Sequence, residues 1–409
     1  MSCAIALCRA IILFTYALRM WLCQVKYYWC SRVGLLRRRW RSGHRTTRFA
    51  RWSIVPYMGA LVDTSLGLAA CGLLPDHLLS AIIDRRIRRV LHRFEDLTVQ
   101  DLERDQATLC DRLSRAPVAE AVGSANEQHY EVPARFFEIV LGPRLKYSSC
   151  LWPPGVVDLA AAEEAMLGLT AERAHLRDGQ RVLELGCGWG SLCLWTAEHF
   201  PNSRVLAVTN SASQREFVLA RAAERGLSNL DVLKADVSHL ELEPAAFDRV
   251  VSVEMFEHMK NYPELFARIG TWLRPDGRLF VHVFCHRRFS YEFDANASGA
   301  WMARHFFTGG TMPSYSLLPS LCRDLELEDR WAVAGTHYAR TLQAWLDRLD
   351  AHREAARVAL AGRTGARAAV SRASWGDVGR WRLFLMACRQ TFALEGGREY
   401  IVAHYRWKK

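Results

Sequence analysis

The sequence predicts an α/β fold in which helices cover both faces of a parallel sheet. Short apolar segments alternate with helical segments between residues 158 and 284. Strands separated by helices pair in parallel through right-handed crossovers, and the helices then cover the sheet. The first apolar segment also runs directly into a glycine-rich turn, Gly186–Gly190. Such a turn lets the backbone pass close beneath a ligand, because no Cβ is in the way.

The strands of this sheet are predicted where short apolar runs stop at glycine or polar residues. Five central runs fit this description: Arg181–Leu185, Arg204–Val208, Leu230–Lys234, Phe247–Val253 and Arg278–Phe284. The apolar segment Tyr400–Trp407 suits a last strand. A ligand is expected at the carboxyl ends of the parallel strands, which are followed by Gly186, Thr209, Asp236 and Glu254.

Helices are predicted between these strands. One runs from Asp158, a good N-cap, to about Ala174. Three others begin near Ser191, Ser213 and Tyr262. These helices supply the crossovers that a parallel sheet needs.

Further helices are predicted outside the sheet. Residues 59–115 read as helical, and within them residues 76–96 place Leu, Ile and Val near helical spacing with arginines on the opposite face. That arginine stripe indicates a solvated face, and contact with a membrane surface is the alternative. Near the C-terminus, helices are predicted at Thr341–Leu360 and Trp375–Phe392, with an Ala/Gly/Arg-rich surface loop, Ala361–Ala373, between them.

The net charge of +11 comes from the start of the chain. Residues 1–57 hold eleven Arg or Lys and no Asp or Glu, so the remainder is formally neutral and gives no general case for nucleic-acid binding. This basic leader fits an organelle-targeting segment or a segment that touches an anionic membrane. The other interpretation is a wrong start site, with Met58 as the true start.

The sequence therefore divides into the leader 1–57, a helical N-terminal region 58–125 and a ligand-binding domain 126–409. We expect a cytoplasmic protein, or a membrane-associated or organelle-targeted one if the leader is real. The twelve cysteines form no C-x-x-C and no spacing suited to zinc, so reduced thiols and no metal are predicted. His282 and His286 lie too far apart on one strand to share an ion.

The glycine turn has the spacing G-x-G-x-G, whereas a dinucleotide fingerprint would be G-x-G-x-x-G. The second predicted strand ends in Thr209-Asn210, with no carboxylate for the ribose of NAD. Both differences favour S-adenosylmethionine as the ligand and disfavour a nicotinamide oxidoreductase.

Two carboxylates and an imidazole follow the fourth predicted strand, at Glu254, Glu257 and His258. Burying them without partners would cost several kcal/mol, so the cluster indicates chemistry rather than core packing. A solvated helix start with acidic residues is the alternative.

Motifs along the chain resemble those of one enzyme family. Besides the glycine turn they are Gln128-His129-Tyr130, Leu145-Lys146-Tyr147-Ser148, Val208–Ser211 with Gln214, Glu254–Tyr262, Cys285-His286, Gly310–Ser314, and Trp381-Arg382 with Cys388. From about residue 60 to the C-terminus the chain resembles the cyclopropane-fatty-acid synthase family of methyltransferases, and within it the coclaurine N-methyltransferase branch. The resemblance implies a Rossmann-like, seven-stranded class I methyltransferase sheet in residues 126–409, with an N-terminal helical lid and C-terminal helical additions.

The resemblance implies S-adenosylmethionine as the cofactor. Tyr147 and Ser148 resemble the family's lid over it. Asp236 is placed for the adenine amino group, with Val237 beside the ring, and a plain helix N-cap is the alternative for Asp236. The other expected contacts come from the glycines and from polar groups that can hydrogen-bond ribose hydroxyls: Gly186, Gly188, Gly190, Thr209, Asn210 and Gln214.

At the reacting end, Glu254, Glu257 and His258 match the Glu-Glu-His set of the amine site in the coclaurine N-methyltransferase branch. The carboxylates would hold the substrate ammonium, and His258 would assist proton removal. In the cyclopropane synthases the position of Glu254 is characteristically glycine. Those enzymes attack the methyl group with an alkene and use a bound bicarbonate to remove a proton.

The bicarbonate cage of those synthases maps onto Ser149, Glu257, His282, Phe284 and Tyr338. Glu257, His282 and Tyr338 match in type. Ser149 replaces a cysteine, and Phe284 replaces an aliphatic residue. The cage is partly kept, so bicarbonate stays open as a second cofactor.

Two enzyme functions are therefore expected. The first is methylation of the nitrogen of a small amine, and the second is a cyclopropane synthase or related lipid methyltransferase that acts on unsaturated acyl chains. The intact Glu-Glu-His set argues against a third interpretation, a protein that binds the cofactor without catalysis. Peripheral membrane contact and a homodimer are left open.

Cys388 matches a C-terminal cysteine once treated as catalytic in this family. A cysteine in an apolar helix is a poor nucleophile, because burial raises the pKa of its thiol.

Overall fold

The computed structural model describes residues 75–120, 132–294, 301–361 and 372–409. Several predictions lie outside these residues: the basic leader, the boundary at residues 57 and 58, the helical segment 59–74, the motif at residues 128–130 and most of the surface loop 361–373. In the part that is described, no helix is both long and apolar enough to cross a bilayer.

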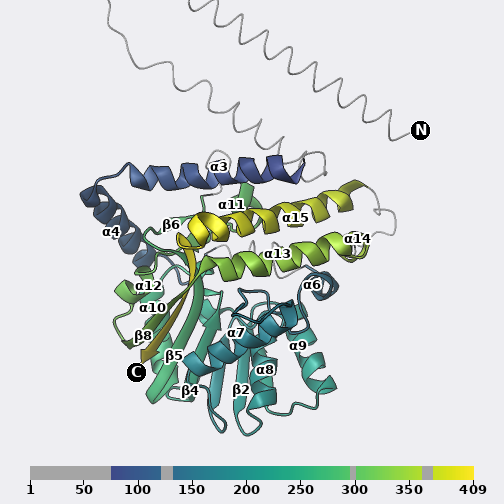
Figure 1. Ribbon diagram of the computed structural model, residues 1–409. Coiled ribbons are helices and arrows are strands. Elements are labelled where there is room, and N and C mark those ends of the chain that lie inside the picture. The colour runs from purple at the N-terminus through teal and green to yellow at the C-terminus, as the bar shows by residue number, and fades with distance from the viewer. Residues whose placement is uncertain (1–74, 121–131, 295–300, 362–371) are drawn as a thin grey trace, which may run out of the picture. The chain divides into compact units, whose positions relative to one another are not determined.

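One seven-stranded sheet forms the centre of the fold, with the order β3-β2-β1-β4-β5-β9-β8 (Figure 1). Five strands are parallel: β1 (Arg181–Leu185), β2 (Arg204–Thr209), β3 (Leu230–Lys234), β4 (Phe247–Val253) and β5 (Leu273–His286). β9 (Tyr400–Lys408) is antiparallel to both of its neighbours, β5 and β8 (Glu326–Val333). The predicted fold class is confirmed, together with all six predicted strands.

The edge strand β8 was not predicted. Its sequence Glu-Leu-Glu-Asp-Arg-Trp-Ala-Val is mostly polar, and only Val333 is fully buried. Neither face of this edge strand is buried along its length, so its sequence shows no clear apolar alternation. A small two-stranded sheet of β6 (Tyr291–Glu292) and β7 (Thr311–Met312) was also not predicted.

Helices cover both faces of the sheet, as the strand order requires (Figure 1). One face carries α7 (Leu159–Arg173), α8 (Ser191–His199) and α9 (Ala212–Glu224), which share an apolar core with β1 to β4. The other face carries α4 (Val99–Arg115), α10 (Tyr262–Trp272) and α12 (Leu317–Leu321).

A third group of helices lies across the carboxyl ends of the parallel strands (Figure 1). Its members are α3 (Asp76–Glu95), α6 (Ala134–Val140), α11 (Trp301–His305), α13 (Gly335–Ala351), α14 (Arg353–Ala361) and α15 (Arg372–Ala393). The single helix predicted at 341–360 is wrong. The chain forms α13 and α14 there, because His352 leaves the helical conformation at φ −122° and ψ 32°.

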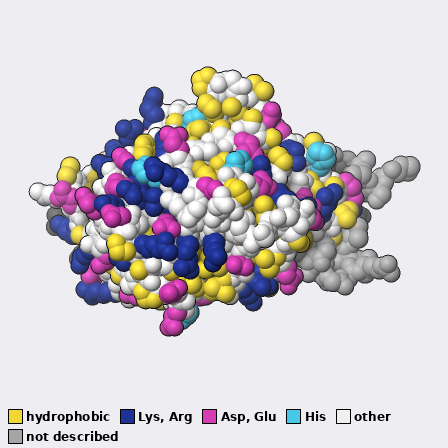
Figure 2. All heavy atoms as spheres, turned by 90° about the horizontal axis from the view of Figure 1, so that it is seen from below, with side chains coloured by type: hydrophobic (Ala, Val, Ile, Leu, Met, Phe, Trp, Pro, Cys, Tyr) yellow, Lys and Arg dark blue, Asp and Glu magenta, His cyan; other side chains and the backbone are white. Residues whose placement is uncertain are grey.

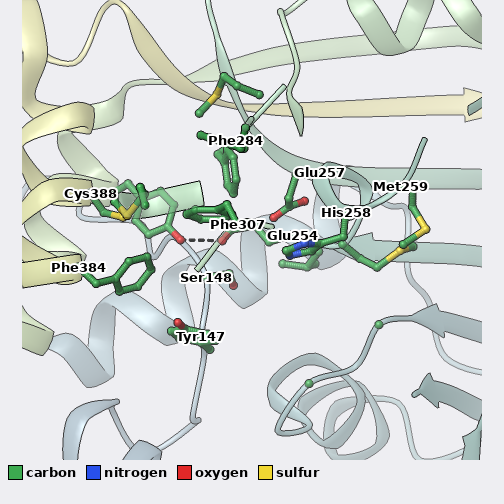
Figure 3. A pocket seen from close by; sticks show the side chains of 18 of the residues that line it. Tyr147, Ser148, Glu254, Glu257, His258, Met259, Phe284, Phe307, Phe384 and Cys388 are labelled. Atoms are coloured by element: carbon green, nitrogen blue, oxygen red, sulfur yellow. Dashed lines mark hydrogen bonds between the residues drawn. The ribbon is translucent and has the colours of Figure 1, made fainter. Parts of the chain in front are cut away.

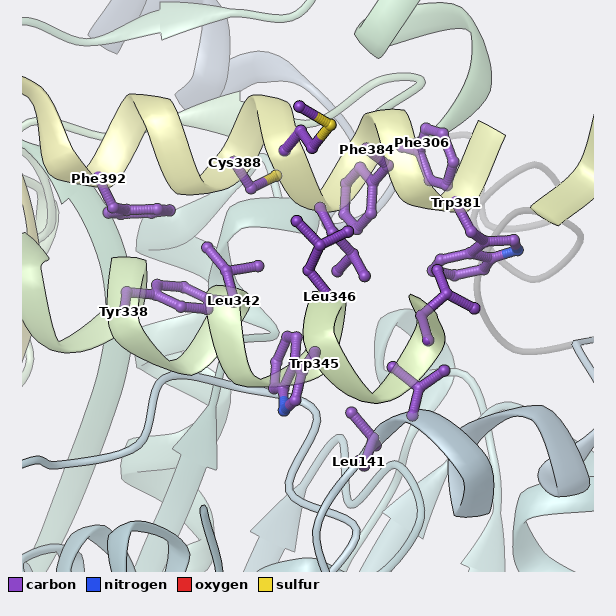
Figure 4. Close-up of a cluster of buried hydrophobic side chains, with 14 of the residues drawn as sticks. Leu141, Phe306, Tyr338, Leu342, Trp345, Leu346, Trp381, Phe384, Cys388 and Phe392 are labelled. Carbon is purple, nitrogen blue, oxygen red and sulfur yellow. The ribbon is translucent and has the colours of Figure 1, made fainter. Parts of the chain in front are cut away.

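The helices α13 and α15 pack side by side through large apolar side chains (Figure 4). Leu342 and Leu346 of α13 point into the space between the helices, toward Cys388 and Phe384 of α15, whereas Trp345 points away from α15 (Figure 4). The rings of Tyr338 and Phe392 stack with centroids 4.4 Å apart. This packing fixes the position of the first turns of α13, which carry Tyr338.

On the face of the molecule shown in Figure 2, basic side chains are interspersed with acidic ones. Many of the described arginines have acidic partners, such as Arg278 with Glu328 at 2.8 Å and Arg274 with Asp248 at 2.9 Å. This face therefore carries charges of both signs rather than a basic patch.

Gly335 provides a test of how tightly α13 is seated. A Cβ at this position would lie 2.0 Å from the carbonyl oxygen of Tyr400 and 2.5 Å from that of Phe392. We predict that Gly335→Ala lowers the free energy of unfolding by about 1–3 kcal/mol or more, because neither backbone oxygen can move aside. Urea unfolding measures the change. The control is Gly376→Ala in α15, where a Cβ meets no atom within 4 Å; equal midpoints for the two variants would contradict the prediction.

Candidate active site

A cavity of about 580 Å³ lies at the carboxyl ends of β1, β2 and β4. The glycine turn, the segment before α7 and the helices α3, α13 and α15 line it. Its lining is mainly apolar and aromatic with a few converging polar groups, which is typical of a site for a small molecule. Arg85, Arg88, Arg89 and Arg93 of α3 are exposed, as the predicted solvated face requires, and Arg86 and Arg93 also line this cavity.

The three glycines of the turn have two different roles. All have positive φ angles, 81° at Gly186, 52° at Gly188 and 85° at Gly190. Gly186 and Gly188 line the cavity. Gly190 does not, and a Cβ there would lie 2.8 Å from Val218 of α9. A Cβ at Gly188 would meet no atom within 4 Å, so this glycine leaves room for a ligand, whereas a Cβ at Gly186 would lie 2.8 Å from Met255. Gly190 allows α8 to pack against α9.

The ends of β2 and β3 place the predicted nucleoside contacts on the cavity wall. Thr209 donates a hydrogen bond of 2.7 Å to Gln214, and Asn210 lines the cavity beside them. Asp236 and Val237 also line it. Asp236 accepts the N–H of Ser238 at 2.8 Å. Its carboxylate is therefore both a helix N-cap and part of the cavity wall.

Glu184 of β1 is a cavity residue that the sequence analysis missed. Its side chain is buried, and among the described residues its Oε2 has no hydrogen-bond partner. Burial raises the pKa of this carboxyl to about 8. The available signal was a carboxylate inside an otherwise apolar strand that leads into the glycine turn.

Ser191 and Trp189 also line the cavity, and the hydroxyl of Ser191 and the indole N–H of Trp189 are buried and lack partners within the described residues. Buried polar groups without partners are costly, so a ligand is expected to pair with them. The amino-acid tail of S-adenosylmethionine has an ammonium that suits Glu184 and a carboxylate that suits a hydroxyl or N–H donor. The residues present therefore fit this cofactor.

Glu254 follows β4, and its carboxylate has hydrogen-bond partners from three other parts of the chain. Its carboxylate accepts hydrogen bonds from the N–H of Ser149 at 2.9 Å and from the hydroxyl of Tyr338 at 2.7 Å. Nε2 of His282 lies 3.2 Å from its Oε1. The side chain is 7 % exposed and lines the cavity, whereas Ser149 and His282 lie behind it.

Glu257 and His258 lie on the next turn, η3 (Phe256–His258), and both line the cavity. Figure 3 shows them beside Glu254 and close to the rings of Phe284 and Phe307. Glu257 is buried, and burial and the Glu254 carboxylate raise its pKa well above the ordinary value. Burial also raises the pKa of Glu254, but its three hydrogen-bond donors favour the ionised form, so we assign the negative charge of the pair to Glu254 and a proton to Glu257.

The segment before α7 is held by a buried lysine that the sequence analysis did not assign. Tyr147 and Ser148 line the cavity as predicted lid residues. Nζ of Lys146 donates to the hydroxyl of Ser148 and, at 2.8 Å, to the carbonyl oxygen of Ser149. Lys146 thereby orients the segment whose N–H binds Glu254.

Cys388 of α15 lines the cavity on the side opposite to Glu257 and His258 (Figure 3). Burial raises the pKa of its thiol well above the usual range. The thiol is therefore protonated at neutral pH and is a poor nucleophile.

The fold and the cavity together define a class of protein. A seven-stranded sheet of this order, a glycine turn after β1 and polar nucleoside contacts after β2 and β3 are the features of a class I methyltransferase that uses S-adenosylmethionine.

Comparisons with known proteins agree with this class and identify the family. The model of the family described as mycolic acid cyclopropane synthetase matches residues 120–397. The (S)-coclaurine N-methyltransferase of Thalictrum flavum subsp. glaucum is 36% identical over 352 residues, which cover 86% of this chain and 96% of the relative. The cyclopropane-fatty-acyl-phospholipid synthase of Escherichia coli (strain K12) is 32% identical over 224 residues, which cover 54% and 55%.

A crystal structure of coclaurine N-methyltransferase bound to N-methylheliamine and SAH matches with a TM-score of 0.81 and 33% identity, covering 86% of this chain and all of that one. The chain belongs to the mycolic acid cyclopropane synthetase family. It is an S-adenosylmethionine-dependent methyltransferase.

Glu184 leads to a prediction about protons. With a pKa of about 8, this carboxyl is mostly protonated at pH 7 in the cofactor-free protein. A ligand ammonium at its Oε2 favours the ionised form and lowers the pKa, so binding of S-adenosylmethionine at pH 7 should release up to about one proton. Calorimetry in two buffers of different ionisation enthalpy measures this number. Glu184→Gln should lose the release, whereas exposed Glu172→Gln should keep it; a full release in Glu184→Gln would contradict the assignment.

Proposed function

We propose that this enzyme transfers the methyl group of S-adenosylmethionine to the nitrogen of a small amine. The observation that carries the proposal is the hydrogen-bonded carboxylate of Glu254. By the family resemblance, cyclopropane synthases have glycine at this position and hold bicarbonate in the surrounding cage. Here the donors from Ser149, His282 and Tyr338 all bind the Glu254 side chain. The cage therefore already contains a carboxylate of the protein itself.

The residues of the site support chemistry at nitrogen. The cofactor supplies a methyl group on a positively charged sulfur. An amine enters mainly as an ammonium, which has no lone pair, and the negative charge on Glu254 attracts it. Glu254 then accepts one proton from the ammonium, so that the neutral nitrogen can attack: the new N–C bond forms as the S–C bond breaks. His258 is half-buried beside the pair, where it would assist the removal of this proton.

The aromatic walls of the cavity serve the same reaction. Phe284 and Phe307 pack edge to face, with ring centroids 5.9 Å apart, close to the acidic pair. Aromatic faces attract an organic cation and exclude water, which strengthens the attraction between the ammonium and Glu254. The relatives named as N-methyltransferases and the N-methylheliamine in the similar crystal structure support an amine acceptor.

A second candidate function is that of a cyclopropane synthase or related lipid methyltransferase. It is favoured by the apolar lining of the cavity and by Glu257, His282 and Tyr338, which keep the residue types of the bicarbonate cage. The difference at Glu254 makes it the weaker candidate.

An acceptor screen separates the two functions. The protein is incubated with S-adenosylmethionine labelled in its methyl group, together with a pool of secondary and tertiary amines or with vesicles of unsaturated phospholipid. We predict label in the amines, because Glu254 can deprotonate an ammonium. Label that enters only the lipid would replace the proposed function with the second candidate.

Glu254→Gly tests whether the carboxylate acts from inside the cage. The variant should fold, because Glu254 has a φ of 48°, a conformation that glycine adopts more readily than any other residue. We predict that kcat/KM for the amine falls by about 10²–10⁴-fold, the usual contribution of a general base.

Added bicarbonate or formate should raise kcat/KM of the variant by at least about tenfold, because either anion can accept hydrogen bonds from the donors that Glu254 no longer occupies. The unchanged enzyme is the control, and we expect it to be insensitive to both anions. A variant with undiminished amine activity, or a parent enzyme that requires bicarbonate, would contradict the role of Glu254.

A further inference from the structure

A network of four hydrogen-bonded side chains leads from the site through the neighbouring strands β5 and β9 to the end of α7. It runs from Glu254 through His282 on β5 and His404 on β9 to Arg173 at the end of α7. Nε2 of His282 lies 3.2 Å from Glu254 Oε1, Nδ1 of His282 lies 2.9 Å from Nε2 of His404, and Nδ1 of His404 lies 2.8 Å from a guanidinium nitrogen of Arg173. The register of the sheet builds this network, since His282 and His404 are direct partners in the antiparallel pair.

Arg173 fixes the direction of each hydrogen bond in the network. A guanidinium has only N–H donors, so Nδ1 of His404 must accept. A neutral imidazole carries one hydrogen, which makes Nε2–H of His404 the donor to Nδ1 of His282. By the same rule His282 donates its Nε2–H to Glu254. An imidazolium at either histidine would place one N–H against another.

The surroundings of the two histidines favour the neutral form that this geometry requires. Both side chains are fully buried. Burial lowers the pKa of each imidazole well below its ordinary value, and the positive charges of Arg173 and Lys146 act in the same direction.

We propose that Arg173 is a positioning residue of this methyltransferase, which fixes both histidine tautomers and thereby presents Nε2–H of His282 to the Glu254 carboxylate. The inference rests on the proposed function, in which ionised Glu254 receives the ammonium. Without the guanidinium, both histidines can take the opposite tautomer. A lone pair of His282 would then face Glu254, and Glu254 would hold a proton instead of accepting one from the amine.

Other groups around Glu254 also influence its charge. The positive charge of Lys146 and the hydroxyl of Tyr338 favour its ionised form, while burial and the neighbouring Glu257 oppose it. The thiol of Cys388, on α15, is protonated because burial raises its pKa. None of these groups lies on α7. A substitution of Arg173 on α7 therefore changes the histidine network and leaves the other groups around Glu254 in place.

The test compares Arg173→Met, which loses the donor, with Arg173→Lys, which keeps a donor-only cation. The control is Arg406→Met. Arg406 lies over the same ring of Trp331, at 5.4 Å against 4.8 Å for Arg173, and it donates to the main-chain carbonyl oxygen of Arg173 at 3.0 Å. Its side-chain partners are Glu328, Asp329 and His175, and not His404, so this variant disturbs the end of α7 without removing a member of the network. Infrared difference spectra between each protein and its Glu254→Gln counterpart give the protonated fraction of Glu254 against pH, with no methyl acceptor present.

We expect Arg173→Met to move the titration midpoint of Glu254, and the acidic limb of kcat/KM for the amine, upward by about one pH unit, which corresponds to a tenfold change. Arg173→Lys should keep the parent midpoint, and Arg406→Met should keep it even if it lowers thermal stability. An unchanged midpoint in Arg173→Met would overturn the inference.

A second measurement needs no variant, so it decides the matter even if Arg173→Met fails to fold. Nitrogen-15 NMR of histidine-labelled parent protein should show His282 and His404 as Nε2–H tautomers; an Nδ1–H form or an imidazolium at either one would overturn the inference. Failure of the proposed function looks different. In that case the spectroscopic results stand as expected, but no amine is methylated.

Discussion

The site depends on one constraint: a carboxylate is held out of water and in a strained backbone conformation at the end of β4. A positive φ costs a residue with a side chain about 1 kcal/mol or more, and a buried charge costs several times that amount without partners. The three donors to Glu254 offset both costs. They come from three separate parts of the chain: the segment before α7, strand β5 and helix α13.

Much of the surrounding architecture can be understood as support for these donors. Lys146 holds the segment that contains Ser149, and the contact of Gly335 with the backbone of Tyr400 seats the start of α13, from which Tyr338 reaches the carboxylate. The helices α13 and α15, which pack together through apolar side chains (Figure 4), both line the cavity. The same enclosure raises the pKa of Glu257, so one member of the acidic pair is charged and the other is neutral. An arrangement of this kind attracts a single positive charge.

The parts of the fold that could be predicted are those with a local signal. Apolar strands that stop at glycine, and the spacing of the turn after β1, are visible in a short window of sequence. Strand β8 and the break at His352 are not, because pairing with β9 and packing against α15 decide them. The role of Gly190 likewise depends on Val218 of α9, a contact that only the folded chain reveals.

The same division applies to the site. The acidic pair and His258 lie within five residues and could be found directly. Glu184 was visible as a charge in an apolar strand but was not assigned. The partnership of His404 with His282 follows from the register of two strands 122 residues apart in the chain. Arg173 belongs to a helix whose sequence gives no sign of chemistry, so sequence alone could not connect it to Glu254.

The most direct test of this account is a crystal structure of the enzyme soaked with SAH and N-methylheliamine, the amine found in the similar structure. The account predicts the amine nitrogen within hydrogen-bond distance of Glu254 or Glu257, about 3 Å, and on the side that faces the sulfur. It also predicts that Glu254 keeps its contacts with Ser149, His282 and Tyr338. A Glu254 side chain turned out of the cage, with a bicarbonate ion in its place, would contradict the account.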